Sequence, residues 1–202
     1  LIPFLGAIAV ARLRNAHQAR SWSAWITGAA LICAVAAWQD YGIVQAQVLP
    51  AGEHAMEADD RWHLMQNLIG REVFTIDQLS APLLPLGALL YFVTTIATLR
   101  TKVRRFSFAS MLFTEGVLLA TFSCRIPEVI LGLMVVGMMP PYLEMRARGA
   151  TGRVDAIHMA LFTALVVIGW TLVRLTPEEE VPGRFAAMAL LAAMLIRGGV
   201  FP

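Results

Sequence analysis

The chain has 202 residues, of which 58% are hydrophobic and 15% charged, and its mean hydropathy is +0.66. Soluble domains have about 45–50% apolar and about 25% charged residues, so this composition predicts an all-α integral membrane protein. The net charge is only +2. The basic residues form short clusters between apolar runs and no basic face, which excludes nucleic acid as a partner.

Apolar runs divide the chain at intervals that suit membrane crossing, which takes about 20 residues per helix. We therefore predict a single transmembrane domain over residues 1–202, a bundle of about seven transmembrane helices. We expect the first and last spans to be truncated, because the first run precedes its basic residues, unlike a signal peptide, and the last reaches Pro202. The predicted spans are 1–11, 22–38, 79–98, 106–122, 129–143, 156–173 and 185–202.

The connections between these runs alternate in charge. Ten basic residues follow the first, third and fifth runs, whereas five lie on the opposite side together with the acidic clusters at 57–60 and 178–180. Lys and Arg are enriched in cytoplasmic loops. We therefore predict a multi-pass protein of the cell inner membrane with its N-terminus outside.

The one long connection, residues 39–76, is predicted to be an outer-side loop of mixed structure. Residues 41–48 and 72–76 have the β-branched and alternating character of a small hairpin, and residues 58–68 could form a short interfacial helix. We expect this loop to cover the helix ends.

Glu115 lies in the middle of the run 106–122, where a carboxylate is costly and usually functional. Hydroxyl residues recur on the same helix at steps of three or four residues or multiples of them, at Ser107, Ser110, Thr114 and Thr121. This stripe could line a hydrated path. Alternatively, the hydroxyl groups bond to their own helix, and Glu115 is protonated and bonded to a neighbour.

Two prolines and a histidine are further candidates. Pro140 and Pro141 remove two backbone donors and should bend or break the fifth span, which frees carbonyl groups for water or a polar side chain. Glu144 follows them, and we interpret it as a surface ion-pair partner of nearby arginines. His158 lies one turn into the sixth span, where it could titrate near neutral pH or form a hydrogen-bonded packing contact.

Three other residues have adequate structural explanations. Asp77 opens the third span, where an N-terminal cap accepts backbone N–H bonds. Cys33 and Cys124 have no metal-ligand spacing, so we interpret them as small buried apolar side chains.

Arg197 is the only charged residue in the 18 residues from Phe185 to Pro202. A charge within a membrane span is expensive, and such residues usually serve transport, proton relay or pairing. Because Arg does not lose its proton in proteins, Arg197 is a fixed cation that requires a counter-charge. We hypothesise that Glu115, the one central carboxylate of the seven runs, provides it.

Two stretches, Phe74 to Leu84 and Ile196 to Pro202, resemble segments of one known family, the antiporter-like subunits of respiratory complex I and of Mrp-type cation/proton antiporters. Phe74 to Leu84 (FTIDQLSAPLL) is similar to the Asp-Gly-Leu-Ser-x-Pro segment that opens the third helix of these subunits. Ile196 to Pro202 (IRGGVFP) is similar to their seventh helix, in which a Lys stands five residues before a Pro. The order of spans agrees, so the resemblance covers essentially the whole chain as the N-terminal half of such a subunit.

The resemblance implies a charge pair between a Glu of helix five and the Lys of helix seven, whose rearrangement gates proton movement. On this chain Arg197 takes the Lys position, while the Glu position falls on Val135, which cannot ionise. The resemblance therefore implies that the usual pair is absent, and we hypothesise that a Glu115–Arg197 interaction replaces it, with Glu115 as the member that exchanges protons.

The function expected from the resemblance is a proton-translocating subunit of a complex I-like NADH:quinone oxidoreductase or an Mrp-type assembly. Its partners would be other membrane subunits, and its substrate protons or Na⁺. No cofactor motif occurs in the sequence, so redox chemistry would belong to other subunits. The alternatives are a degenerate, non-conducting structural subunit and the membrane partner of an inorganic-carbon uptake complex.

Overall fold

The computed structural model describes residues 1–48, 73–74, 76–98, 106–147, 153–175 and 183–197. These residues fold into helices, and their only β pairing is an isolated bridge. The all-α prediction is therefore confirmed. The helices are α1 (Ile2–Ala11), α2 (Ala16–Val48), α4 (Ser80–Ala97), α5 (Phe108–Ser123), α6 (Pro127–Val136), α7 (Met139–Ala147), α8 (Arg153–Leu175) and α9 (Arg184–Arg197).

Three helical segments are long and apolar enough to cross a membrane: Ala16–Gly42, Ser80–Ala97 and Ala156–Leu175. Shorter apolar helices occur at Ile2–Ala11, Phe108–Ser123 and Arg184–Ile196. Exposed large apolar side chains line their outer surfaces. A multi-pass helical membrane protein fits this combination of length and exposed apolar surface.

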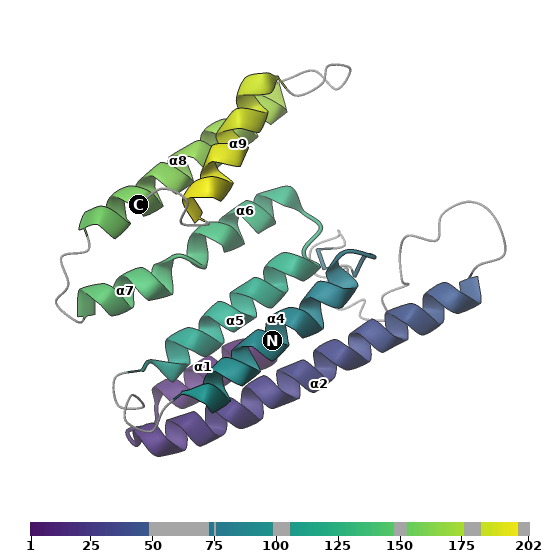
Figure 1. The fold of residues 1–202 in the computed structure, drawn as a ribbon, viewed down its shortest axis with the longest axis vertical. Coiled ribbons are helices and arrows are strands. Elements are labelled where there is room, and N and C mark those ends of the chain that lie inside the picture. The colour runs from purple at the N-terminus through teal and green to yellow at the C-terminus, as the bar shows by residue number, and fades with distance from the viewer. Residues whose placement is uncertain (49–72, 75, 99–105, 148–152, 176–182, 198–202) are drawn as a thin grey trace. The chain divides into compact units, whose positions relative to one another are not determined.

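The chain divides into two compact units, Leu1–Pro140 and Pro141–Pro202. In the first unit α1, α2, α4 and α5 pack side by side, and α6 packs on α5 (Figure 1). Small residues allow close approach between these helices. The rings of Phe4 and Phe113 meet edge to face at a centroid distance of 5.6 Å, and a Cβ atom at Gly116 would lie 3.0 Å from the Phe4 ring. A side chain at residue 116 would therefore force the Phe4 ring of α1 to shift.

Contacts at the two ends of this unit set the directions of its helices. The Arg20 guanidinium at the start of α2 donates a 2.9 Å hydrogen bond to the Ile96 carbonyl at the end of α4. At the opposite end Phe74 and Cys124 form an antiparallel bridge, and the Arg125 N–H donates to the Val73 carbonyl at 2.9 Å. Neighbouring helices α2 and α4, and α4 and α5, therefore run antiparallel.

The start of α4 confirms the predicted role of Asp77. Its carboxylate accepts the backbone N–H groups of Leu79 (3.1 Å) and Ser80 (2.6 Å), while the Ser80 hydroxyl accepts the Asp77 N–H at 2.8 Å. This reciprocal arrangement satisfies donors that have no partner within the helix. The hydrogen bond from the Ser80 backbone lowers the pKa of Asp77 below its ordinary value.

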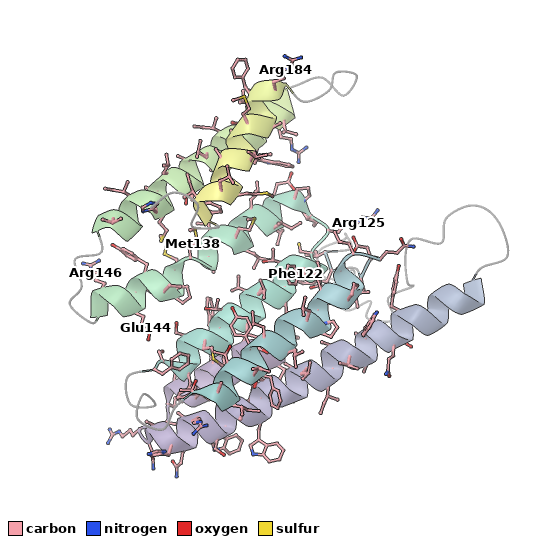
Figure 2. The ribbon with its side chains drawn as sticks, in the orientation of Figure 1. Phe122, Arg125, Met138, Glu144, Arg146 and Arg184 are labelled. Atoms are coloured by element: carbon pink, nitrogen blue, oxygen red, sulfur yellow. The ribbon has the colours of Figure 1, made fainter. Side chains whose placement is uncertain are left out.

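The predicted break near Pro140 and Pro141 is also present. Helix α6 ends at Val136, the chain turns at Gly137 and Met138, and α7 begins at Met139 (Figure 2). Because proline has no N–H group, residues 140 and 141 cannot donate to the carbonyls four residues earlier, at Val136 and Gly137. The backbone of the predicted fifth span is therefore interrupted one turn before its end.

The second unit is built mainly on the pair α8 and α9. A Cβ atom at Gly169 would lie 2.7 Å from Leu190 Cγ and 3.4 Å from the Ala186 carbonyl oxygen, so the two helices approach closely there. The buried side chains of the pair are apolar, namely Phe162, Val166, Ala186 and Ala193.

Two expectations were wrong. Helix α2 continues through residues 41–48, which therefore do not form a hairpin strand, and Phe74 pairs with Cys124 instead. Cys33 is exposed on α2, whereas Cys124 is buried as expected. A helix that packs through one side leaves its other side open, whatever apolar residues it carries. The expected interfacial helix at 58–68 lies outside the described residues.

Candidate functional site

Glu115 is fully buried inside the first unit, with 0% of its surface exposed. It lies at the centre of α5, a helix that starts where the Ser107 hydroxyl accepts the Ser110 N–H at 3.3 Å. Apolar residues on every side of this helix favour complete burial of its central turns. The sequence of α5 therefore carries Glu115 into the interior.

The neighbours of Glu115 along α5 show which helices surround it. Leu112, one turn before, packs with Ala7 of α1 and Ala19 of α2. Leu118 and Leu119, about one turn after, lie near Gly87 of α4. Because residues three and four apart share a helix face, Glu115 lies on the face of α5 that is turned toward these three helices.

Both carboxyl oxygens of Glu115 are buried and have no hydrogen-bond partner among the described residues. Leaving a buried polar group unsatisfied costs about 1–3 kcal/mol, and more when the group is charged. An ionised carboxylate would be far more costly here than a neutral carboxyl group unless water or a cation reached it. The expected hydrogen bond to a protein neighbour is not found within this part of the chain.

The hydroxyl stripe on α5 is explained by bonding within the helix. Thr114 donates to the Ser110 carbonyl at 2.9 Å, and Thr121 donates to the Val117 carbonyl at 2.7 Å. Ser107 caps the helix. The alternative that these hydroxyl groups bond to their own helix therefore holds for these three residues, and they give no support to a hydrated path.

Sequence reasoning missed three other fully buried polar side chains, Ser23 and Thr27 on α2 and Thr95 on α4. Thr27 donates to the Ala24 carbonyl at 3.3 Å and Thr95 to the Tyr91 carbonyl at 2.8 Å. The Ser23 hydroxyl, like Glu115, has no partner among the described residues. The spacing of Ser23 and Thr27, four residues apart in an apolar run, is the one sequence signal that could have indicated them.

The other sequence candidates are not brought to Glu115 by the described contacts. His158 on α8 is half-buried, and its Nδ1 atom lies 2.8 Å from the Val154 carbonyl, as expected for a packing histidine. Arg197 is the last residue of α9, and its side chain lies outside the described residues. The Glu115–Arg197 interaction therefore remains a prediction.

Val135, the residue that the expected resemblance aligned with a Glu, is half-buried on α6. Gly137, two residues later, approaches Val117 of α5, since its Cβ atom would lie 3.2 Å from Val117 Cγ1. Val117 follows Glu115 by two residues, or about 200° around the helix. Helix α6 therefore packs on the side of α5 that faces away from Glu115.

Glu144 is half-buried and Arg146 exposed on α7 (Figure 2). No group of three or more His, Cys, Asp or Glu side chains that could hold a metal ion occurs among the described residues. Glu115 is the one buried acidic or basic side chain in this part of the chain. It is therefore the candidate site.

No family model matches this sequence, and no curated protein or solved structure matches it either.

Proposed function

We propose that this chain is part of a proton-translocating, antiporter-like membrane subunit, in which Glu115 takes up and releases the proton. The observation that carries the proposal is the burial of both Glu115 oxygens with no hydrogen-bond partner in the part of the chain that the structure describes. A functional role is the simplest explanation for a carboxyl group whose burial lowers stability, and intramembrane carboxyl groups commonly carry protons.

The helices that enclose Glu115 support a membrane location. Trp22 and Trp38 are 58% and 48% exposed on α2. They are 16 residues apart in the sequence, or about 24 Å along a helix axis. Tryptophan is enriched at the two membrane interfaces, about 30 Å apart. A seven-span bundle with its N-terminus outside is part of the proposal.

In this subunit Arg197 would act as a fixed electrostatic bias, because a guanidinium group keeps its proton. Val135 cannot replace the family's carboxylate, and it lies on a helix that packs on the far side of α5 from Glu115. The proton would therefore be carried by the interior of the first unit. The partners would be other membrane subunits of an assembly of the complex I or Mrp type.

The test is proton flux through the full chain, purified with the subunits that accompany it and reconstituted into vesicles. A K⁺ diffusion potential supplies the driving force, and a trapped pH dye reports the flux. Glu115→Gln keeps the size and hydrogen-bonding capacity of the side chain but cannot ionise. We expect a loss of flux of at least about 100-fold, in the range typical of removing a positioned proton-transfer group.

Glu128→Gln is the matched control, because Glu128 is an exposed carboxylate in the first turn of α6. It should conduct like the wild type. Unchanged flux in Glu115→Gln would refute the proposed role of Glu115. An assembled wild-type complex without any flux would instead favour a non-conducting structural subunit. Flux that depends on bicarbonate would favour an inorganic-carbon uptake complex.

A further inference from the structure

Two buried groups in the first unit lack complementary partners. The Ser23 hydroxyl group can donate one hydrogen bond but meets no acceptor, and the Glu115 carboxyl group can accept several but meets no donor, among the described residues. Both side chains are 0% exposed. Each is therefore a site of unmet hydrogen bonding within the same helical unit.

Contacts with α1 give the register of α2 against α5. Ile26 of α2 approaches Gly6, because a Cβ atom there would lie 2.6 Å from Ile26 Cγ2. Phe4, two residues before Gly6, lies against Gly116, the residue after Glu115. Thr27 is therefore at nearly the height of Glu115, and Ser23 is one turn, or about 6 Å, from Thr27 along the α2 axis.

Helix α4 closes the same region from another side. The Thr95 hydroxyl lies 3.6 Å from Met111 Sδ, and Met111 is one turn before Glu115 on α5. Thr27 and Thr95 use their hydroxyl protons on backbone carbonyls, so their oxygen lone pairs remain able to accept. Three helices thus bring polar oxygen atoms to within about one helical turn of Glu115 along the helix axes.

We propose that Ser23 and Glu115 are two sides of one buried proton-binding site, bridged by water between α2 and α5. This inference rests on the proposed function and adds a second residue to it. Buried water typically forms about three hydrogen bonds to otherwise unsatisfied groups. Here a water molecule accepts from the Ser23 hydroxyl, donates to Glu115, and can donate to a threonine oxygen.

The proposed step is a simple proton transfer. When Glu115 ionises, its O–H bond breaks and the proton passes to the bridging water, which releases one of its own protons to a further water molecule as hydrated H⁺ and stays in place. The Ser23 hydroxyl keeps its own proton and supports the new carboxylate through its hydrogen bond to this bridging water. Ser23 is therefore a positioning residue, because it lowers the cost of ionising Glu115 without carrying the proton.

The ionisable groups on the helices packed against α5 do not replace Ser23 as the residue that supports the ionised Glu115. Helix α1 has no ionisable side chain, and α4 has only Tyr91. Helix α6 has only Glu128, in its exposed first turn. The ionisable side chains of α2 are His17, Arg20, Cys33, Asp40 and Tyr41. Arg20 is the nearest of these to Ser23 in the sequence, and it donates its hydrogen bond to the Ile96 carbonyl at the end of α4.

The test compares Ser23→Ala with Ser21→Ala, a matched control on the exposed side of the same helix. Infrared difference spectra of the full assembly, recorded during pH titration, follow the C=O band of the protonated carboxyl group that Glu115→Gln removes. Exchange into H₂¹⁸O identifies bound water through the shift of its O–H band. Flux is measured in the same preparations.

We expect Ser23→Ala to raise the pH midpoint of the Glu115 band by about 1–2 units, the size expected for losing a hydrogen bond to a charged group. The water band should disappear, and flux should fall about 10- to 100-fold at fixed pH. Ser21→Ala should change none of these. Ser23→Cys, which keeps a weak donor, should lie between Ser23→Ala and the wild type.

A Ser23→Ala spectrum identical to the wild type in midpoint and water band would overturn the inference, even if Glu115→Gln had stopped the flux. A shifted midpoint and lost water band in an assembly that does not conduct would support the shared site and refute the proposed function. If Ser23→Ala does not assemble, the comparison of Ser23→Cys with the wild type decides the same question.

Discussion

The two units of the chain bury different kinds of side chain. The group formed by α1, α2, α4 and α5 encloses Ser23, Thr27, Thr95 and Glu115, whereas the buried side chains described in the α8–α9 pair are apolar. Two helices can cover only a stripe along their contact, but four can surround a group on all sides. Among the described residues, an enclosed carboxyl group therefore occurs only in the first unit.

The contact between α8 and α9 offers the strongest test of this contrast, because the two helices pack closely through apolar side chains. Gly169→Val would place side-chain atoms where Leu190 and the Ala186 carbonyl already lie. We expect a loss of about 3 kcal/mol in the free energy of unfolding, at the upper end of overpacking effects. Detergent-induced unfolding followed by circular dichroism measures it.

Gly42→Val is the control for this substitution, because a Cβ atom at Gly42 of α2 would meet no atom within 4 Å. It shares the change in helix propensity from glycine to valine without the collision. Equal losses in the two variants would mean that the close approach of α8 and α9 does not limit their stability.

Removing the buried Glu115 carboxyl group from the first unit should raise the free energy of unfolding, whereas Gly169→Val should lower it. Glu115→Met replaces an unpartnered buried carboxyl group by an apolar side chain of similar length, so we expect about 2 kcal/mol of added stability. The same variant should lose proton flux. Unfolding in detergent and flux in vesicles test both halves, and a destabilised variant would indicate that Glu115 has a partner outside the described residues.

The smallest effect is expected at the surface of the first unit, where Asp77 caps α4. Asp77→Ala should cost about 1 kcal/mol, as is usual for a lost cap. Because the folded pKa of Asp77 is below its unfolded value of about 3.9, the stabilisation is fully present above that pH and is lost as the pH falls through the folded pKa. Thermal unfolding at pH 7 and at pH 2–3 tests this.

Asp77→Asn is the corresponding control, because the amide oxygen still accepts the two N–H groups but carries no charge. It should retain most of the stability at pH 7 and lose the pH dependence. A difference between Asp77→Ala and the wild type that persists unchanged at low pH would contradict the assigned ionisation.

Several features followed from local sequence because they depend on local forces. Runs of apolar residues predicted the positions of α2, α4, α5 and α8. Asp77 was predicted as a cap, and Pro140 with Pro141 as a helix break, because an N-cap bond and a missing N–H act within one or two turns. The predicted end of α2 was wrong, because residues 41–48 suit either a strand or a helix and α2 continues through them in the structure.

Only part of the candidate site could be predicted from the sequence. Glu115 stood out as a charge in an apolar run, and sequence alone was enough to select it. The hydroxyl residues chosen beside it, Thr114 and Thr121, bond their own helix, whereas Ser23 and Thr95 come from helices that no local pattern connects to α5. Sequence periodicity gives the face of one helix but not the face that packs against it.

Sequence by itself therefore determined the helical, membrane-like character of the chain, its main helices and the choice of Glu115 as the candidate residue, because hydrophobicity and the cost of a buried charge are properties of the residues. Tertiary structure alone decided that Glu115 is enclosed between its own helix and α1, α2 and α4, that the Ser23 hydroxyl in the same unit has no partner among the described residues, and that α6 packs on the side of α5 away from Glu115. These facts depend on packing register, which small residues such as Gly6 and Gly116 set through close contact between helices distant in sequence.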